Sequence, residues 1–313
     1  MFFNEAPYLA RRGKLRQLLG RRRSAHAFND ALLRVARQHR PDVLLVVKGL
    51  AVWPDVLRTI KMEIGATLVN FATDDPFNPR VSSRELVMGI REYHLYCCVR
   101  KAMIPDVLAA GCPWAEFVMC GYHPATHFAP QTRIKPGFDV TMIGGADADR
   151  VPFARALASL DEVALTLFGG YWDRDPVCRR YAMGMLVGDQ YRKALWLSKI
   201  AICLVRRANR DDHAMKTFEL PACRVFTLFE DTDTHRALFG ALGEDIFFRT
   251  PEDLVQRVRF WLGRPTLRER MAWAEWTVVT KGKHTWQDRY DQILGMAEQV
   301  RAAARGIASQ KGG

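Results

Sequence analysis

The sequence lacks a long apolar run, a paired-cysteine motif and an internal repeat. No apolar stretch in the 313 residues approaches the roughly 20 residues needed to cross a bilayer. The first residues, Met1–Glu5, do not have the layout of a signal peptide. The seven cysteines are odd in number and show no C-x-x-C spacing, so the sequence indicates neither a disulfide framework nor a zinc site. We therefore expect a cytoplasmic chain in a reducing compartment.

Positive charge is in excess and unevenly distributed. The formal net charge is +12, and residues 1–40 hold ten Lys or Arg against two Asp or Glu, a local balance of +8. Leucines among the arginines of residues 8–23 give a basic amphipathic pattern, typical either of peripheral contact with a membrane or of a solvated helix face. No zinc-finger, RRM or homeodomain signature accompanies it, and no aromatic residues interleave the basic run, which disfavours nucleic acid as a partner.

The chain length suits two domains, and strand-like and helix-like segments alternate along it. This alternation predicts two doubly wound α/β domains with parallel sheets. A Pro- and Gly-containing stretch at residues 128–137 is the expected linker. The expected strands are 41–49, 66–72, 94–99, 117–119, 138–145, 162–168, 200–204, 225–229 and 246–248.

A short helix pattern from Met215 to Ala222 follows two acids, Asp211 and Asp212. The start of such a helix offers unpaired N–H groups and a positive dipole to a phosphate. Lys216 adds a cation, and one turn further Glu219 can accept hydrogen bonds from the two hydroxyls of a ribose. The pattern indicates a nucleotide site; the alternative is an amphipathic helix with a solvated glutamate.

The residues from His213 to Cys223, HAMKTFELPAC, resemble the signature of CgeB-like (spore maturation type) glycosyltransferases. PDVLLVVKG, NFATDDPF, DVTMIGG and HTWQDR, elsewhere in the chain, are similar to further elements of that family, so that the resemblance covers roughly residues 2–295. It implies a GT-B fold, in which two Rossmann-like domains face a cleft. The implied parts are an acceptor-side domain at 1–130, a nucleotide-sugar domain at 131–285, a helix at 286–301 that crosses back, and a disordered tail at 302–313.

The resemblance also implies roles for individual residues of the second domain. The acid-x7-acid spacing from Asp211 to Glu219 is similar to the E-x7-E pair of retaining family 4 glycosyltransferases, which places Asp211 at the donor sugar. Arg150 and Lys216 would balance the charge of a departing diphosphate. Two D-x-D sequences, at 147–149 and 231–233, are not assigned to a metal, because GT-B enzymes generally need none. The expected donor-binding residues are Gly144, Gly145, Arg150, Gly188, Lys199, His213, Met215, Lys216 and Glu219.

In the first domain, candidate residues follow two of the expected strands. Ligands of open parallel sheets bind beyond the carboxyl ends of the strands. This rule places Lys48 on the acceptor side, and it makes Asp74 or Asp75 a candidate for orienting the acceptor or taking its proton. The alternative is that one of these aspartates caps a turn before Pro76.

The chain departs from the family pattern in three ways. Asp211 replaces a glutamate, Arg224 and Val225 replace two glycines, and the first strand–helix unit of relatives has no counterpart ahead of residue 2. We expect a hexosyltransferase-like enzyme, retaining and without a cofactor, that uses a nucleotide-diphosphate sugar and an unidentified acceptor. The alternatives are a catalytically inactive GT-B scaffold, or a membrane-surface or nucleic-acid binder acting through the basic segment.

Overall fold

The structure is a computed structural model that describes residues 3–4, 17–132 and 134–311. The chain forms two compact units: unit 1 comprises Met1–Met119 with Tyr290–Gly313, and unit 2 comprises Cys120–Arg289. The basic amphipathic pattern expected at 8–23 lies outside the described residues up to position 16, and at 17–23 the structure describes the helical backbone alone. Within the described ranges, no helix has the length and apolarity needed to cross a membrane.

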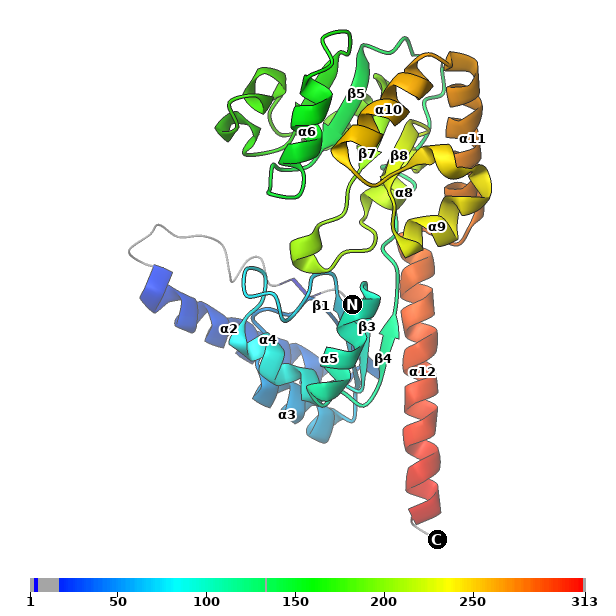
Figure 1. Cartoon of the computed structure of the whole chain (residues 1–313). Helices are drawn as coiled ribbons and strands as arrows, with labels where there is room; N and C mark the ends of the chain where they lie inside the picture. The colour runs from blue at the N-terminus through cyan, green and yellow to red at the C-terminus, as the bar shows by residue number, and fades with distance from the viewer. Residues whose placement is uncertain (1–2, 5–16, 133, 312–313) are drawn as a thin grey trace. The chain divides into compact units, whose positions relative to one another are not determined.

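Unit 1 is built on a four-stranded parallel sheet (Figure 1). The strands lie in sequence order, and all six residues of β2 are buried, as expected for the middle of a parallel sheet. The strands are β1 (Val43–Val47), β2 (Thr67–Ala72), β3 (Leu95–Cys98) and β4 (Ala115–Phe117). The helices are α2 (Gln17–His39), α3 (Pro54–Ile64), α4 (Arg84–Gly89) and α5 (Ile104–Ala109).

The ends of α3 show how local sequence sets these elements. Pro54 starts the helix, where a missing N–H costs nothing, and Gly65 ends it with φ +76°. Between them Val56, Leu57 and Ile60 form the buried face. The last helix, α12 (Trp286–Lys311), joins unit 1 from Tyr290 onward and buries a similar stripe of Ile293, Ala297 and Val300.

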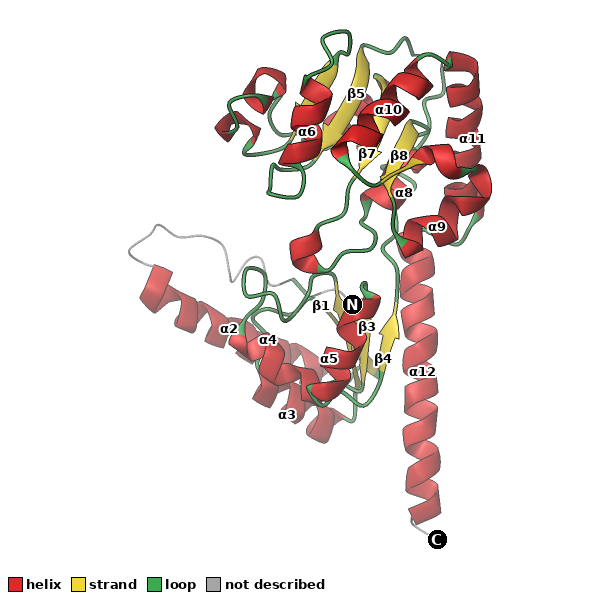
Figure 2. Ribbon diagram, viewed as in Figure 1, coloured by secondary structure: helices red, strands yellow, loops and turns green. Residues whose placement is uncertain are grey.

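Unit 2 contains a five-stranded parallel sheet in the order β6-β5-β7-β8-β9 (Figure 2). This is the 2-1-3-4-5 order of doubly wound sheets, so the winding direction reverses between β5 and β7. Helix α6 packs against α10, and α8 packs against α11. The strands are β5 (Phe138–Ile143), β6 (Leu165–Phe168), β7 (Ser198–Cys203), β8 (Phe226–Glu230) and β9 (Phe247–Phe248). The helices are α6 (Val151–Ala158), α7 (Asp189–Trp196), α8 (Lys216–Ala222), α9 (Asp233–Phe239), α10 (Pro251–Leu262) and α11 (Pro265–Lys281).

The predicted pair of α/β domains with parallel sheets is confirmed. Among the described strands, the winding reverses in the sheet of unit 2, whereas those of unit 1 lie in sequence order. The division between the units falls after Met119, whereas the sequence suggested 130. The reason is that unit 2 holds the intervening segment: Arg192 donates to the carbonyl of Thr126 at 2.8 Å, and Trp196 donates to that of Phe128 at 2.9 Å. The segment expected to be a disordered tail from residue 302 lies within α12 as far as Lys311, in keeping with the helix propensity of its alanines and arginines.

Candidate functional site

The candidate site lies where β5 and β7 of unit 2 end, at the point where the winding reverses. Gly144 follows β5 with φ +145°, and its carbonyl accepts a hydrogen bond from the indole of Trp172 at 2.8 Å. A Cβ on Gly169, which follows β6, would lie 2.3 Å from the Gly144 carbonyl oxygen, so only glycine fits there. The backbone at this edge is therefore tightly packed and can approach a ligand closely.

Two cations meet beside this glycine. Arg150 is only 9% exposed; its guanidinium donates to the Gly145 carbonyl at 3.1 Å and pairs with Asp147 at 2.8 Å. Lys216 lines the same narrow crevice as Gly144 and Arg150, and burial and the Arg150 charge lower the pKa of Lys216. Like charges held together in a partly buried position are stabilised by an anion.

Backbone N–H groups add to these charges at the start of α8. The amide of Ala214 is bonded to Thr217 Oγ1 at 3.0 Å, and Thr217 is held in turn by His235 at 2.8 Å. Within the described ranges the amides of Met215 and Lys216 have no acceptor. Helix α8 has seven residues, so these local amides and the two cations, more than a helix dipole, favour an anion here.

Glu219 lies one turn further along α8 and is held in place. The Tyr191 hydroxyl donates to Glu219 Oε2 at 2.8 Å, and His127 Nε2 lies 3.8 Å from Oε1. Burial and the neighbouring carboxylate raise the pKa of Tyr191, and burial lowers the pKa of His127. Tyr191 therefore remains a hydrogen-bond donor at neutral pH and fixes the direction of the carboxylate.

His213 has both ring nitrogens occupied. Its Nδ1 lies 2.8 Å from Asp212 Oδ1, and its Nε2 accepts from the Cys120 amide at 2.9 Å. The ring is buried, and Arg289 donates to the carbonyl of the same Cys120 at 3.0 Å. In this geometry His213 positions the start of α8, whereas Met215 is exposed.

The two acids ahead of α8 differ in their surroundings. Asp212 is engaged by His213 and by Thr234, whose hydroxyl donates to Asp212 Oδ2 at 2.7 Å. Asp211 is half-buried on the β7–α8 loop and accepts from Asn209 at 3.3 Å. Asp211 thus lies on the loop that leads into α8, five residues before Lys216.

Two expected donor-binding residues lie elsewhere in unit 2. Lys199 is at the amino-terminal end of β7, paired with Asp139 at 2.6 Å, so it is on the opposite edge of the sheet from Gly144. Gly188, with φ +55°, precedes α7 and lies three residues before Tyr191. The structure thus brings four of the expected donor-binding residues together beyond the end of β5: Gly144, Gly145, Arg150 and Lys216. Lys199 lies away from this group.

The acceptor-side candidates belong to unit 1. Lys48 Nζ pairs with Asp74 Oδ2 at 2.6 Å, at the carboxyl ends of β1 and β2. Asp75 is buried, and its Oδ1 accepts from the Phe77 amide at 2.9 Å, the geometry of an Asx turn. The turn-capping alternative therefore describes Asp75.

The sequence did not single out three of the residues that shape the site: His127, Trp172 and Tyr191. The G-x-x-Y spacing from Gly188 was a signal for Tyr191, whereas nothing in the sequence linked His127 to Glu219.

The two D-x-D sequences, at 147–149 and 231–233, contribute acids to ion pairs. Asp147 pairs with Arg150, and Asp231 pairs with Arg236 and Arg249. Among the described residues no group of three or more His, Cys, Asp or Glu side chains is arranged to hold a metal ion.

Comparison with known proteins agrees with this architecture. Residues 150–295 match the family model described as glycosyl transferase-like. A search of curated proteins by sequence gives no match. The N-terminal domain of Candida albicans trehalose-6-phosphate phosphatase is similar in structure, at 10% identity and a TM-score of 0.62, over 95% of this chain and 78% of that one.

Two further solved structures share the fold. TarM of S. aureus aligns with a TM-score of 0.59 at 9% identity, over 86% of this chain and 58% of its own. AviGT4, a glycosyltransferase involved in avilamycin A biosynthesis, aligns with a TM-score of 0.54 at 14% identity, over 85% of this chain and 78% of its own. The two parallel-sheet units therefore have a GT-B fold, and the match to the glycosyl transferase-like model falls mainly within unit 2.

Proposed function

We propose that this protein is a glycosyltransferase that moves a sugar from a nucleotide-diphosphate donor to an acceptor, with the donor on unit 2. The observation that carries the proposal is the meeting of Arg150 and Lys216 beside Gly144 at the reversal point of the sheet. Glu219, one turn along α8, supplies a fixed carboxylate for a ribose. The match to a glycosyl transferase-like model over residues 150–295 supports the same assignment.

The diphosphate would contact Arg150, Lys216 and the amides of Met215 and Lys216, close to Gly144 and Gly145. When the bond between the sugar C1 and the phosphate oxygen breaks, negative charge grows on the diphosphate, and these groups stabilise it. An S. aureus TarM variant has been solved with UDP, which makes UDP the first nucleotide to test. The base would lie on the Gly188 side, near Tyr191.

The finer assignments follow the family resemblance. Asp211 would contact the donor sugar, and the acid-x7-acid spacing favours retention of configuration, as in a CgeB-like hexosyltransferase without a metal. Asp74, held by Lys48, is the candidate that orients the acceptor or takes its proton as the new glycosidic bond forms. Asp75 is the weaker candidate because it caps a turn.

A thermal-shift panel tests the donor site. UDP, GDP, dTDP, ADP and their sugars are added to the wild type and to Glu219→Ala, Tyr191→Phe and Lys216→Met. A ligand that binds the native state alone stabilises it by roughly 2.7 kcal/mol at a hundred times its Kd. One diphosphate should shift the wild type, with the shift reduced in Tyr191→Phe and lost in the other two variants.

Lys199→Met is the matched control, because it removes one cation from the opposite edge of the same sheet. It should keep the full shift. A shift that is the same in Lys216→Met as in the wild type would refute the site. A shift without any release of nucleotide diphosphate from the sugar donor, with or without a pool of acceptors, would favour a scaffold over an enzyme.

A further inference from the structure

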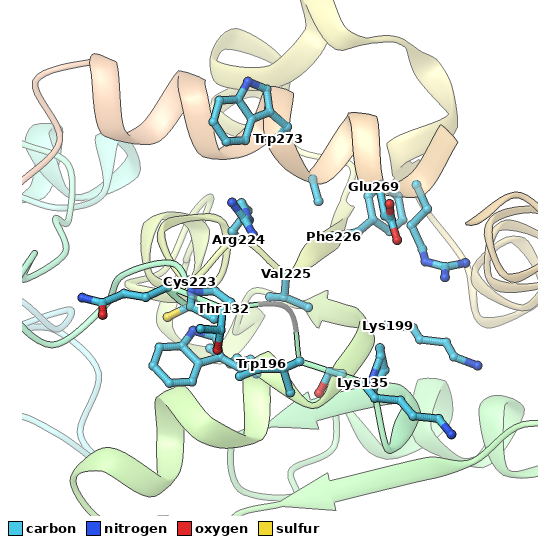
Figure 3. A pocket seen from close by; sticks show the side chains of 18 residues that line it. Thr132, Lys135, Trp196, Lys199, Cys223, Arg224, Val225, Phe226, Glu269 and Trp273 are labelled. Carbon is cyan, nitrogen blue, oxygen red and sulfur yellow. The ribbon is translucent and has the colours of Figure 1, made fainter. Parts of the chain in front are cut away.

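Unit 2 contains a second pocket at the amino-terminal ends of its strands, where β5, β7 and β8 begin. Its volume is about 880 Å³, so it is much larger than the crevice at Gly144. Figure 3 shows the side chains that line it. Its walls come from the segment before β5, the end of α7, the turn after α8 and the first half of α11. A pocket of this size holds a ligand of several rings. The proposed donor site does not use it.

The pocket is lined by more positive than negative charge. Four cations line it: Lys135, Lys199, Arg224 and Arg268. Lys199 is paired with Asp139 at 2.6 Å, whereas within the described part of the chain the other three form no ion pair. Arg268 is 8% exposed, and its guanidinium is fixed by the carbonyl of Trp261 at 2.6 Å. Glu269 is the acid among the lining residues. A ligand that carries negative charge would complete this set of partners.

Two tryptophans supply flat apolar surface in the same pocket. Trp273 on α11 is 54% exposed, and its ring centre lies 4.8 Å from that of Trp276. Trp196 is half-buried, and its ring is fixed by a hydrogen bond to the Phe128 carbonyl. Exposed indole faces pack against rings with an apolar side, such as sugars.

Arg224 connects the charge to the aromatic surface. Its backbone has φ +57°, a left-handed conformation that costs a residue with a side chain about 1–2 kcal/mol and glycine almost nothing. Its guanidinium lies 5.8 Å from the ring centre of Trp273. A side chain retained at a position that favours glycine points to a function for that side chain.

We propose that this pocket binds an anionic oligosaccharide, with sugar rings on Trp273 and Trp196 and its charged groups on Arg224, Arg268 and Lys135. The spacing of the cations favours a chain over a single diphosphate, because Arg224 and Lys135 stand at different sides of the pocket (Figure 3). Charges spread in this way match acidic groups on successive sugars. This proposal concerns a site separate from the donor site and does not depend on it.

Binding of three six-sugar probes to the full chain tests the proposal by calorimetry: neutral maltohexaose, sulfated maltohexaose and hexagalacturonate. Sulfated maltohexaose, hexagalacturonate or both should bind, with an affinity that falls as salt rises, and the neutral probe should bind at least about tenfold more weakly. Whichever charged probe binds identifies sulfate or carboxylate as the recognised group.

Arg224→Gly and Trp273→Ala should each weaken binding about tenfold. The first relieves the left-handed backbone and the second replaces an exposed side chain, so both variants should fold. Arg264→Ala is the matched control: Arg264 stacks on Phe260 at 3.9 Å outside the pocket, and its loss should leave affinity unchanged.

Equal affinity in wild type, Arg224→Gly and Trp273→Ala would overturn the proposal. So would equal binding of the neutral and charged probes. UDP binding that persists in Lys216→Met and is lost in Arg224→Gly would assign the pocket to a nucleotide and would overturn it as well. The first two results leave the donor site untouched, because the Glu219→Ala and Lys216→Met variants test it separately. The third would refute the donor site as well, because UDP binding would then not need Lys216.

Discussion

At the scale of single residues, the carboxyl of Glu275 is the most unusual group in unit 2. It lies on α11, fully buried; its Oε2 accepts from the Thr227 amide at 2.9 Å, and its Oε1 has no partner among the described residues. Burial raises the pKa of Glu275 well above its usual value. The folded protein therefore holds this carboxyl in its neutral form.

Glu275→Gln should stabilise unit 2 at neutral and alkaline pH. Because the folded pKa is raised, the folded state binds the proton more tightly than the unfolded state. The contribution of Glu275 to the free energy of unfolding is therefore greatest at pH values below its pKa in the unfolded chain. It falls by about 1.4 kcal/mol per pH unit as the pH rises from there towards its pKa in the folded protein. Glutamine has no proton to lose, so the free energy of unfolding of Glu275→Gln should not show this fall with pH.

Urea unfolding at several pH values between 5 and 9 measures this difference. Glu269→Gln is the matched control, because Glu269 is exposed on the same helix and should leave the pH dependence unchanged. Parallel stability curves for wild type and Glu275→Gln would contradict the prediction.

At the scale of elements, the start of α12 is held by a reciprocal cap. Thr285 Oγ1 accepts from the Asp288 amide at 3.1 Å, and Asp288 Oδ2 accepts from the Thr285 amide at 2.8 Å. The hydrogen bonds from Thr285 lower the pKa of Asp288. The carboxylate side of the cap is therefore present at neutral pH and is lost as pH falls through that lowered pKa.

Thr285→Ala should destabilise the start of α12 by about 1 kcal/mol, because an N-cap hydroxyl is lost. Hydrogen exchange at the amides of the first turn of α12 should become faster, by about fivefold if opening there is local. Thr285→Ser keeps the hydroxyl and should behave as the wild type. Equal exchange rates in the alanine and serine variants would show that the cap contributes nothing.

Local sequence patterns predicted most of the elements and several of the residues that the structure brings together where β5 and β7 end. Strand ends, the glycines after β5 and the spacing from Lys216 to Glu219 are short-range signals, so they could be recognised directly. Contacts such as Tyr191 to Glu219, or His213 to Cys120, join residues 28 and 93 positions apart, and no spacing rule relates such residues. Their partners are chosen by the packing of whole elements.

Lys199 illustrates the opposite case. The family resemblance places Lys199 among the donor-binding residues, yet β7 begins at Ser198, so Lys199 is at the start of the strand. Ligands in such sheets bind at strand ends. Applying that rule to the direction of the strand would have excluded Lys199 from the sequence alone.

At the scale of the whole molecule, the seven cysteines report on both units. All seven are buried thiols that form no disulfide. Cys97, Cys98 and Cys112 belong to unit 1, and Cys120, Cys178, Cys203 and Cys223 belong to unit 2. Burial raises the pKa of Cys112 to about 11 and the pKa values of Cys178, Cys203 and Cys223 to about 12, so reactive thiolate is scarce in the folded state.

Ellman's reagent should therefore label the native protein slowly and all seven thiols after denaturation. If the donor site is correct, saturating UDP should slow labelling of the cysteines in unit 2 more than of those in unit 1, because it lowers the population of opened unit 2. Peptide mass spectrometry after timed alkylation measures both groups in one sample. Equal slowing in both units would contradict the assignment of the nucleotide to unit 2.

The first and last residues of unit 2 lie side by side and are joined by hydrogen bonds. Arg289 donates to the Cys120 carbonyl at 3.0 Å. The Tyr122 amide donates to the His284 carbonyl at 3.1 Å, and the Trp286 amide donates to the Tyr122 carbonyl at 3.0 Å. The chain of unit 1 thus leaves at Met119 and resumes at Tyr290 from nearly the same point. Unit 2 is therefore one continuous insertion whose two ends are already joined. We expect that it can be expressed as a single fragment, given new termini by circular permutation, or inserted into a surface loop of another protein.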